Sequence, residues 1–109
     1  MNCRNVIPSL REWYETYAPE GLVVIGNHYP EFKSEENLEN LVQAVKELDI
    51  PYPVVQDNQG WNWGAYHVRY WPTLFLIDKQ GHIRYTHIGE GQYEEIEAAI
   101  QTLLAEPAP

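Results

Sequence analysis

A single thiol is the most distinctive reactive group in this sequence. Cys3 is the one cysteine among 109 residues, so neither an internal disulfide nor a zinc site built from several cysteines can form. A helix is predicted to start here, and a helix N-terminus beside Arg4 favours the reactive thiolate. The alternative is a shielded cysteine that packs as a small apolar side chain. We keep Cys3 as the candidate catalytic residue and leave the inert interpretation open.

The histidines lack the spacing of a metal site, and we expect no metal. His82 and His87 are five residues apart on one predicted strand and point to opposite faces. His28 follows the carboxyl end of a predicted strand, a position at which open α/β sheets bind ligands. Glu31 lies close by in the same loop. We name His28 and Glu31 as auxiliary acid–base candidates; solvated loop side chains are the alternative.

The third candidate is the turn Trp71-Pro72-Thr73, which leads into a short apolar run rich in strand formers. A proline that opens a strand removes no ladder hydrogen bond, and it can hold the preceding peptide bond cis. An ordinary trans proline is the alternative. Nearby aromatic residues form either a binding surface or core packing, and among them we expect Trp63 to be exposed.

Hydrophobic periodicity predicts the elements that position these residues. Apolar residues at three- and four-residue steps predict helices over residues 3–17, after a cap at Ser34, and from Tyr93 onward. The continuous apolar run 22–26 predicts a strand buried on both faces, as in parallel sheets. The other predicted elements are strands at 53–56, 73–77 and 82–88, and a short helix at 61–68. This order predicts one α/β domain over residues 1–109, with a parallel centre and an antiparallel edge pair.

Composition excludes several classes of function. The formal charge is −9, with 16 acidic against 7 basic residues, which argues against a surface for nucleic acid or anionic membrane. No apolar run is long enough to span a membrane, and no signal peptide opens the chain. We find no phosphate-binding loop, serine-hydrolase elbow or kinase signature, so we expect no cofactor.

Four segments together resemble a known family. Asn2-Cys3-Arg4 with Pro8 resembles the second half of a Cys-x-x-Cys helix start, and residues 23–26 resemble the second strand. Residues 57–69 resemble the insertion before an active-site proline, and residues 71–83 resemble a cis-proline loop with its strand and turn. The chain thus resembles the thioredoxin-like domains of the redoxin and TlpA/ResA kind, which are extracytoplasmic thiol–disulfide oxidoreductases. It is also similar to the soluble domain of DipZ-type cytochrome c biogenesis proteins.

The resemblance implies a thioredoxin-like sheet flanked by helices, with protein thiols and disulfides as partners. It places Cys3 at the second, resolving position, which is a buried one, and it implies a cis Trp71–Pro72 bond. It assigns Trp71, Pro72 and Thr73 to substrate binding. It also implies a location outside the cytoplasm, in the bacterial periplasm or at the outer face. Because no signal peptide is present, the cytoplasm stays open as an alternative.

One departure from the family leads to two alternative predictions of function. The family's first strand and its nucleophilic cysteine would fall before Met1, and a dithiol cycle needs both sulfurs. The chain is therefore either an oxidoreductase domain that retains one redox cysteine or an inactive thioredoxin-like scaffold or interaction module. A sheet without its first strand has open edges, which predicts self-association as a homodimer. Direct pairing of the remaining strands and a strand supplied by another protein are the alternatives.

Overall fold

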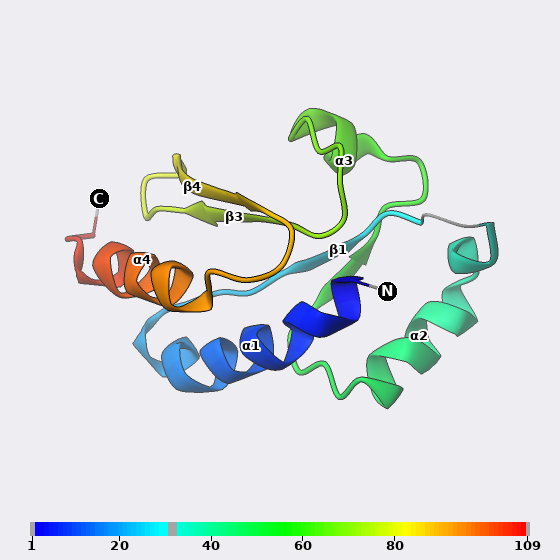
Figure 1. The fold of residues 1–109 in the computed structure, drawn as a ribbon, viewed down its shortest axis with the longest axis horizontal. Helices are drawn as coiled ribbons and strands as arrows, with labels where there is room; N and C mark the ends of the chain where they lie inside the picture. The colour runs from blue at the N-terminus through cyan, green and yellow to red at the C-terminus, as the bar shows by residue number, and fades with distance from the viewer. Residues whose placement is uncertain (1, 31–32, 109) are drawn as a thin grey trace. The chain divides into compact units, whose positions relative to one another are not determined.

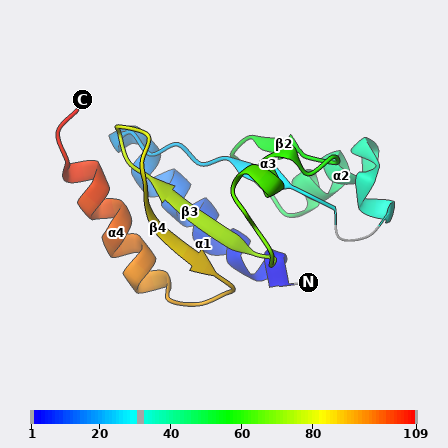
Figure 2. The ribbon, with the colours of Figure 1, turned by 90° about the horizontal axis from the view of Figure 1, so that it is seen from above.

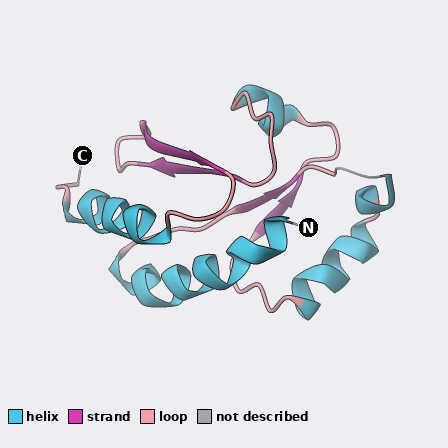
Figure 3. Cartoon of the chain, viewed as in Figure 1, coloured by secondary structure: helices cyan, strands magenta, loops and turns pink. Residues whose placement is uncertain are grey.

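A computed structural model of the chain describes residues 2–30 and 33–108 (Figure 1). The chain divides into two compact units: a first unit of Met1–Leu22 with Tyr70–Pro109, and a second unit of Val23–Arg69. The elements, shown by type in Figure 3, are α1 (Asn2–Tyr17), the 3-10 helix η1 (Ala18–Glu20), β1 (Gly26–His28), the 3-10 helix η2 (Lys33–Glu36), α2 (Leu38–Glu47), β2 (Val54–Gln56), α3 (Trp61–Ala65), β3 (Thr73–Ile77), β4 (Ile83–Ile88) and α4 (Tyr93–Ala105).

The first unit consists of α1, β3, β4 and α4 around one apolar core. β3 and β4 pair antiparallel, with Thr73 opposite Ile88. The helices α1 and α4 cover the same face of this hairpin (Figures 1 and 2). The buried core residues come from these two helices and pack against half-buried side chains of β3; they are Trp13, Tyr17, Ile96 and Ile100. Trp13 and Tyr17 are four residues apart, as are Ile96 and Ile100, and each pair belongs to the apolar stripe that predicted its helix.

The second unit is built on a short parallel sheet. β1 and β2 pair with Gly26 opposite Val54 and His28 opposite Gln56. The backbone N–H of Gly26 also donates to the carbonyl of Pro53 at 2.9 Å. The helix α2 begins after Asn37, whose side-chain oxygen accepts the N–H of Asn40 at 3.1 Å. The predicted cap at Ser34 is therefore wrong, because an asparagine nearer the helix satisfies its first-turn donors.

The strand predicted over residues 22–26 is also displaced. β1 begins at Gly26. Before it, Val23 is 74% and Ile25 62% exposed, whereas Leu22 and Val24 are half-buried. Among the described residues β1 pairs with β2 alone, and β2 is itself three residues long. Because a strand extends only along backbone that a partner strand can bond, the apolar run does not become a buried strand.

The short helix and its tryptophans differ from the prediction as well. α3 ends at Ala65, and two residues later His67 has a φ of 57°, in the left-handed region that terminates helices. Trp63 is half-buried, with its ring centroid 4.7 Å from that of Tyr29, whereas Trp61 is 79% exposed. The expected exposure of Trp63 is therefore wrong, because its ring packs on an aromatic residue far away in the sequence.

Candidate functional site

The turn before β3 is held by hydrogen bonds on both sides of its proline. The Trp71–Pro72 peptide bond is cis. The Thr73 hydroxyl donates to the carbonyl of Tyr70 at 2.7 Å. The backbone N–H of Gly89, directly after β4, donates to the carbonyl of Pro72 at 2.8 Å. Trp71, Pro72 and Thr73 are each half-buried, so the turn is fastened while part of it remains accessible.

Cys3 lies in the first turn of α1, in the same unit as this turn. The side chain of Cys3 is outside the described part of the structure. The helix itself is anchored, since Trp13 and Tyr17 pack in the core beside Leu74 and Leu76 of β3. α1 and β3 also begin at the same end of the first unit (Figure 2). The first turn of α1 and the turn that precedes β3 therefore lie at the same end of this unit.

The auxiliary candidates have a different setting. His28 lies in β1 of the second unit, where its Nε2 is 3.1 Å from the carbonyl oxygen of Glu35. This contact ties the ring to η2. Glu31 lies outside the described residues. Within the described part of the chain, no three His, Cys, Asp or Glu side chains come together as metal ligands would.

Sequence reasoning did not single out Asp57, which lies at the start of the segment 57–69. This carboxylate is 6% exposed and accepts the N–H of Trp63 at 2.9 Å and the N–H of Asn62 at 3.3 Å. It also accepts the side-chain amide of Asn27 at 3.2 Å. Burial by itself raises the pKa of the Asp57 carboxyl, but these donors together hold that pKa below its ordinary value. Asp57 thus fastens the first turn of α3 to β1, a task that an aspartate shortly before a helix signals.

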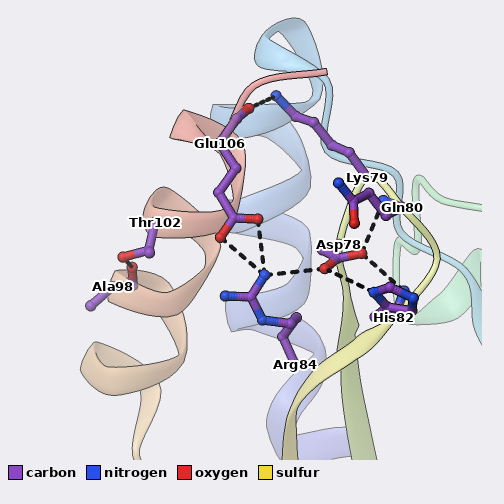
Figure 4. Close-up of polar contacts among 8 residues, drawn as sticks. All are labelled: Asp78, Lys79, Gln80, His82, Arg84, Ala98, Thr102 and Glu106. Carbon is purple, nitrogen blue, oxygen red and sulfur yellow. Dashed lines mark hydrogen bonds and ion pairs between the residues drawn. The ribbon is translucent and has the colours of Figure 1, made fainter. Parts of the chain in front are cut away.

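A second polar cluster closes the other end of the hairpin (Figure 4). Asp78 accepts the backbone N–H groups of Gln80 and His82, each at 2.9 Å. The bond from His82 and the Arg84 guanidinium hold the pKa of Asp78 below its ordinary value, against the opposing effect of burial. Arg84 also pairs with Glu106 at 3.0 Å, just beyond α4. The β3–β4 turn and the end of α4 are therefore joined by side chains distant in sequence.

Lys79 strengthens the same junction. Its ammonium group donates to the carbonyl oxygens of Leu104 at 3.0 Å and Glu106 at 2.6 Å. The last carbonyls of a helix have no partner within the helix, and a cation there also interacts favourably with the negative end of the helix dipole. The cluster thus stabilises the C-terminal end of α4 at the end of the hairpin away from the Pro72 turn.

In the described residues, no helix is long and apolar enough to cross a membrane.

Comparison of the sequence with known proteins finds a matching family profile and several related proteins. The AhpC/TSA family profile matches residues 1–86. Protein DipZ of Mycobacterium bovis is 38% identical over 109 residues, which is 100% of this chain and 16% of that protein. The thiol-disulfide oxidoreductase ResA of Bacillus cereus is 33% identical over 101 residues, or 93% of this chain and 56% of that protein. The chain therefore spans about a sixth of DipZ and just over half of ResA.

Solved structures show the same fold. A thioredoxin-like superfamily protein is 31% identical, with a TM-score of 0.84 over 94% of this chain and 71% of that one. A thiol-disulfide isomerase from Corynebacterium glutamicum has a TM-score of 0.85 at 23% identity, covering 97% of this chain and 74% of that one. At that identity the second likeness shows the fold alone. The predicted thioredoxin-like α/β fold is confirmed by both structures.

Proposed function

Because the chain belongs to the AhpC/TSA family, as a thioredoxin-like domain of the TlpA/ResA kind, we propose that it exchanges disulfides with protein thiols. Cys3 is the redox residue in this proposal, and Trp71, Pro72 and Thr73 receive the substrate polypeptide. One observation carries the proposal: α1, which has Cys3 in its first turn, and β3, which follows the Pro72 turn, begin at the same end of the first unit (Figure 2). His28 and Glu31 stay auxiliary candidates.

The first step of disulfide exchange uses a single sulfur of this chain. The Cys3 thiolate attacks one sulfur of a substrate disulfide, a new S–S bond forms, and the other substrate sulfur leaves as a thiolate. The helix N-terminus favours the thiolate that attacks. A second thiol, from outside residues 1–109, then attacks the mixed disulfide and releases the substrate. An extended substrate bonds to the backbone of the turn, and Trp71 gives it an apolar contact.

Capture of the mixed disulfide tests this function. We expect a peptide with an intramolecular disulfide to form a covalent adduct with the chain, which intact-mass spectrometry detects and a reductant removes. Cys3→Ser is the control and must form no adduct. Insulin reduction driven by dithiothreitol measures turnover. If the wild-type chain forms no adduct and reduces insulin only at the background rate, the oxidoreductase proposal fails.

A second candidate, an inactive scaffold that self-associates, is favoured by a specific surface of the second unit. Among the described residues its sheet consists of β1 and β2 alone, so both are edge strands. Val23 and Ile25, which precede β1, expose much of their apolar surface. Sedimentation velocity should then show a homodimer of the 12.7 kDa chain, with dissociation on dilution. A single monomeric species at high concentration contradicts self-association.

We also propose that residues 1–109 act as one domain and that this domain works outside the cytoplasm. The family profile spans residues 1–86, which include parts of both compact units, and this supports the single domain. The likeness to TlpA/ResA-type domains supports the location. Fractionation of cells that express the natural gene tests the location, and recovery in the cytoplasmic fraction contradicts it.

A further inference from the structure

The hydroxyl of Thr73 has a defined partner within the turn. It donates to the carbonyl of Tyr70 at 2.7 Å, an ordinary length for a good O–H···O bond. This bond joins the two ends of the segment that contains Trp71 and Pro72. A threonine hydroxyl has one proton, so while this bond stands the hydroxyl has no proton to donate to a substrate. The resemblance placed Thr73 among the substrate-binding residues, and the contact gives its side chain a different task.

The strand β4 fastens the same turn from the other side. Thr73 is opposite Ile88 in the hairpin, and the next residue, Gly89, donates its N–H to the carbonyl of Pro72 at 2.8 Å. The carbonyls of Tyr70 and Pro72, which lie on either side of Trp71, therefore each accept one hydrogen bond. Tyr70 is 61% exposed, so the Thr73 bond competes with water and gives a moderate stabilisation.

We propose that Thr73 is a positioning residue, whose hydroxyl holds the turn from Tyr70 to Thr73 in the shape that receives a substrate polypeptide. This inference rests on the proposed function of the turn. Without the hydroxyl, the Tyr70 carbonyl loses its partner and the turn samples other shapes. Substrate then binds more weakly, because ordering the turn opposes association. The hydroxyl thus acts on the substrate through the backbone of Trp71 and Pro72.

Two variants separate the hydroxyl from the shape of the side chain. Thr73→Val removes the hydroxyl and keeps a β-branched side chain, whereas Thr73→Ser keeps the hydroxyl. The first measurement is NMR hydrogen exchange of the Gly89 amide, which reports directly on the closed turn. We expect exchange about fivefold faster in Thr73→Val, the effect of losing one hydrogen bond of ordinary strength, and little change in Thr73→Ser. Equal exchange in Thr73→Val and wild type overturns the inference, whatever the chain does with thiols.

The second measurement is the rate at which Cys3 reacts with two disulfides of different size. We expect Thr73→Val to slow the reaction with a disulfide-bonded peptide by about fivefold, with Thr73→Ser close to wild type. Reaction with 2-hydroxyethyl disulfide, which has no peptide group to bond to the turn, should be slowed less by Thr73→Val than the reaction with the peptide. If Thr73→Val slows both reactions equally, the residue acts on the thiol or the fold and the inference is overturned. If wild-type Cys3 reacts with neither disulfide, the proposed function fails, and the exchange of Gly89 still decides whether Thr73 holds the turn.

Discussion

Asp57 shows how much a single buried carboxylate can organise. Backbone N–H groups at the start of α3 converge on it, together with the side-chain amide of Asn27. Asn62 extends this link, since its side-chain N–H donates to the side-chain oxygen Oδ1 of Asn27 at 3.0 Å. A charged carboxylate is costly to bury unless its hydrogen bonds are made, and here they are. The ionised form of Asp57 is therefore part of the folded second unit.

Asp57→Asn is expected to change both stability and its dependence on pH. Because the pKa of Asp57 is lowered on folding, its carboxylate stabilises the fold fully above the ordinary pKa of 3.8. This contribution is lost as the pH falls through the folded-state pKa. The asparagine variant should lose about 1–3 kcal/mol of unfolding free energy at pH 7. It should also show a shallower decline below about pH 4, because it has no such proton to bind. Urea unfolding at several pH values measures both effects.

A matched control for this comparison lies in the same unit. Glu39→Gln removes an exposed carboxylate from the first turn of α2, outside the Asp57 cluster. We expect this variant to unfold with a pH profile parallel to that of the wild type. A decline in Asp57→Asn as steep as that in Glu39→Gln contradicts the role of the ionised Asp57.

At the scale of elements, α3 depends on its surroundings more than on its own sequence. Five residues are too few to form a stable helix alone. The helix begins after Gly60, which has a φ of 73° and lies against the ring of Tyr29. That ring in turn packs on Trp63 from within the helix. A glycine with a left-handed backbone, a buried carboxylate and an aromatic pair thus hold α3 in place.

Gly60→Ala tests this arrangement. A Cβ at this position would lie 2.9 Å from Cε1 of Tyr29, and the positive φ adds strain for any residue with a side chain. We expect a loss of about 1–3 kcal/mol in unfolding free energy. Gly64→Ala is the control, because it lies in the same helix with open space around it and should be neutral or slightly stabilising. Equal effects of the two substitutions would show that the contact with Tyr29 carries no weight.

At the scale of the whole molecule, the core is unevenly distributed. The first unit holds the apolar cluster around Ile96, which is 1% exposed. Tyr17 extends that cluster with a polar edge, donating to Glu97 at 2.6 Å and accepting from Gln101 at 2.8 Å. The bond to Glu97, with burial, raises the pKa of Tyr17 and keeps its phenol protonated. The second unit has a buried apolar residue of its own, Tyr52, so whether residues 1–109 unfold as one domain is a separate question.

Ile96→Ala answers that question. Removing a fully buried isoleucine should cost about 2–5 kcal/mol. If residues 1–109 form one cooperative domain, NMR amide signals from β3 and from β1 should disappear at the same urea concentration, and the substitution should shift both equally. Ile83→Ala is the control, because Ile83 is 50% exposed and its loss should change little. A shift confined to β3 would instead mean that the two units unfold independently.

Local information determined much of this protein. The run 73–77 became β3 with the predicted bounds, because a proline before it and a polar turn after it define a strand without help from distant residues. Amphipathic spacing likewise predicted α1 and α4, and the motif pattern placed Cys3 at a helix start and Pro72 in a turn. The α/β class follows from these elements and their order, whereas the thioredoxin-like family was implied by the resemblance of four segments to its motifs.

Contacts between residues distant in sequence decided the rest. Val23 and Ile25 lie in solvent because a strand needs a partner, and no pattern in the run itself reveals whether one is present. Trp63 packs and Trp61 does not because of the position of Tyr29. The bond from Gly89 to Pro72 and the pairing of Arg84 with Glu106 arise only when the hairpin and α4 are in place. Periodicity reports which face of an element is apolar, whereas the partner of a particular side chain is set by tertiary packing.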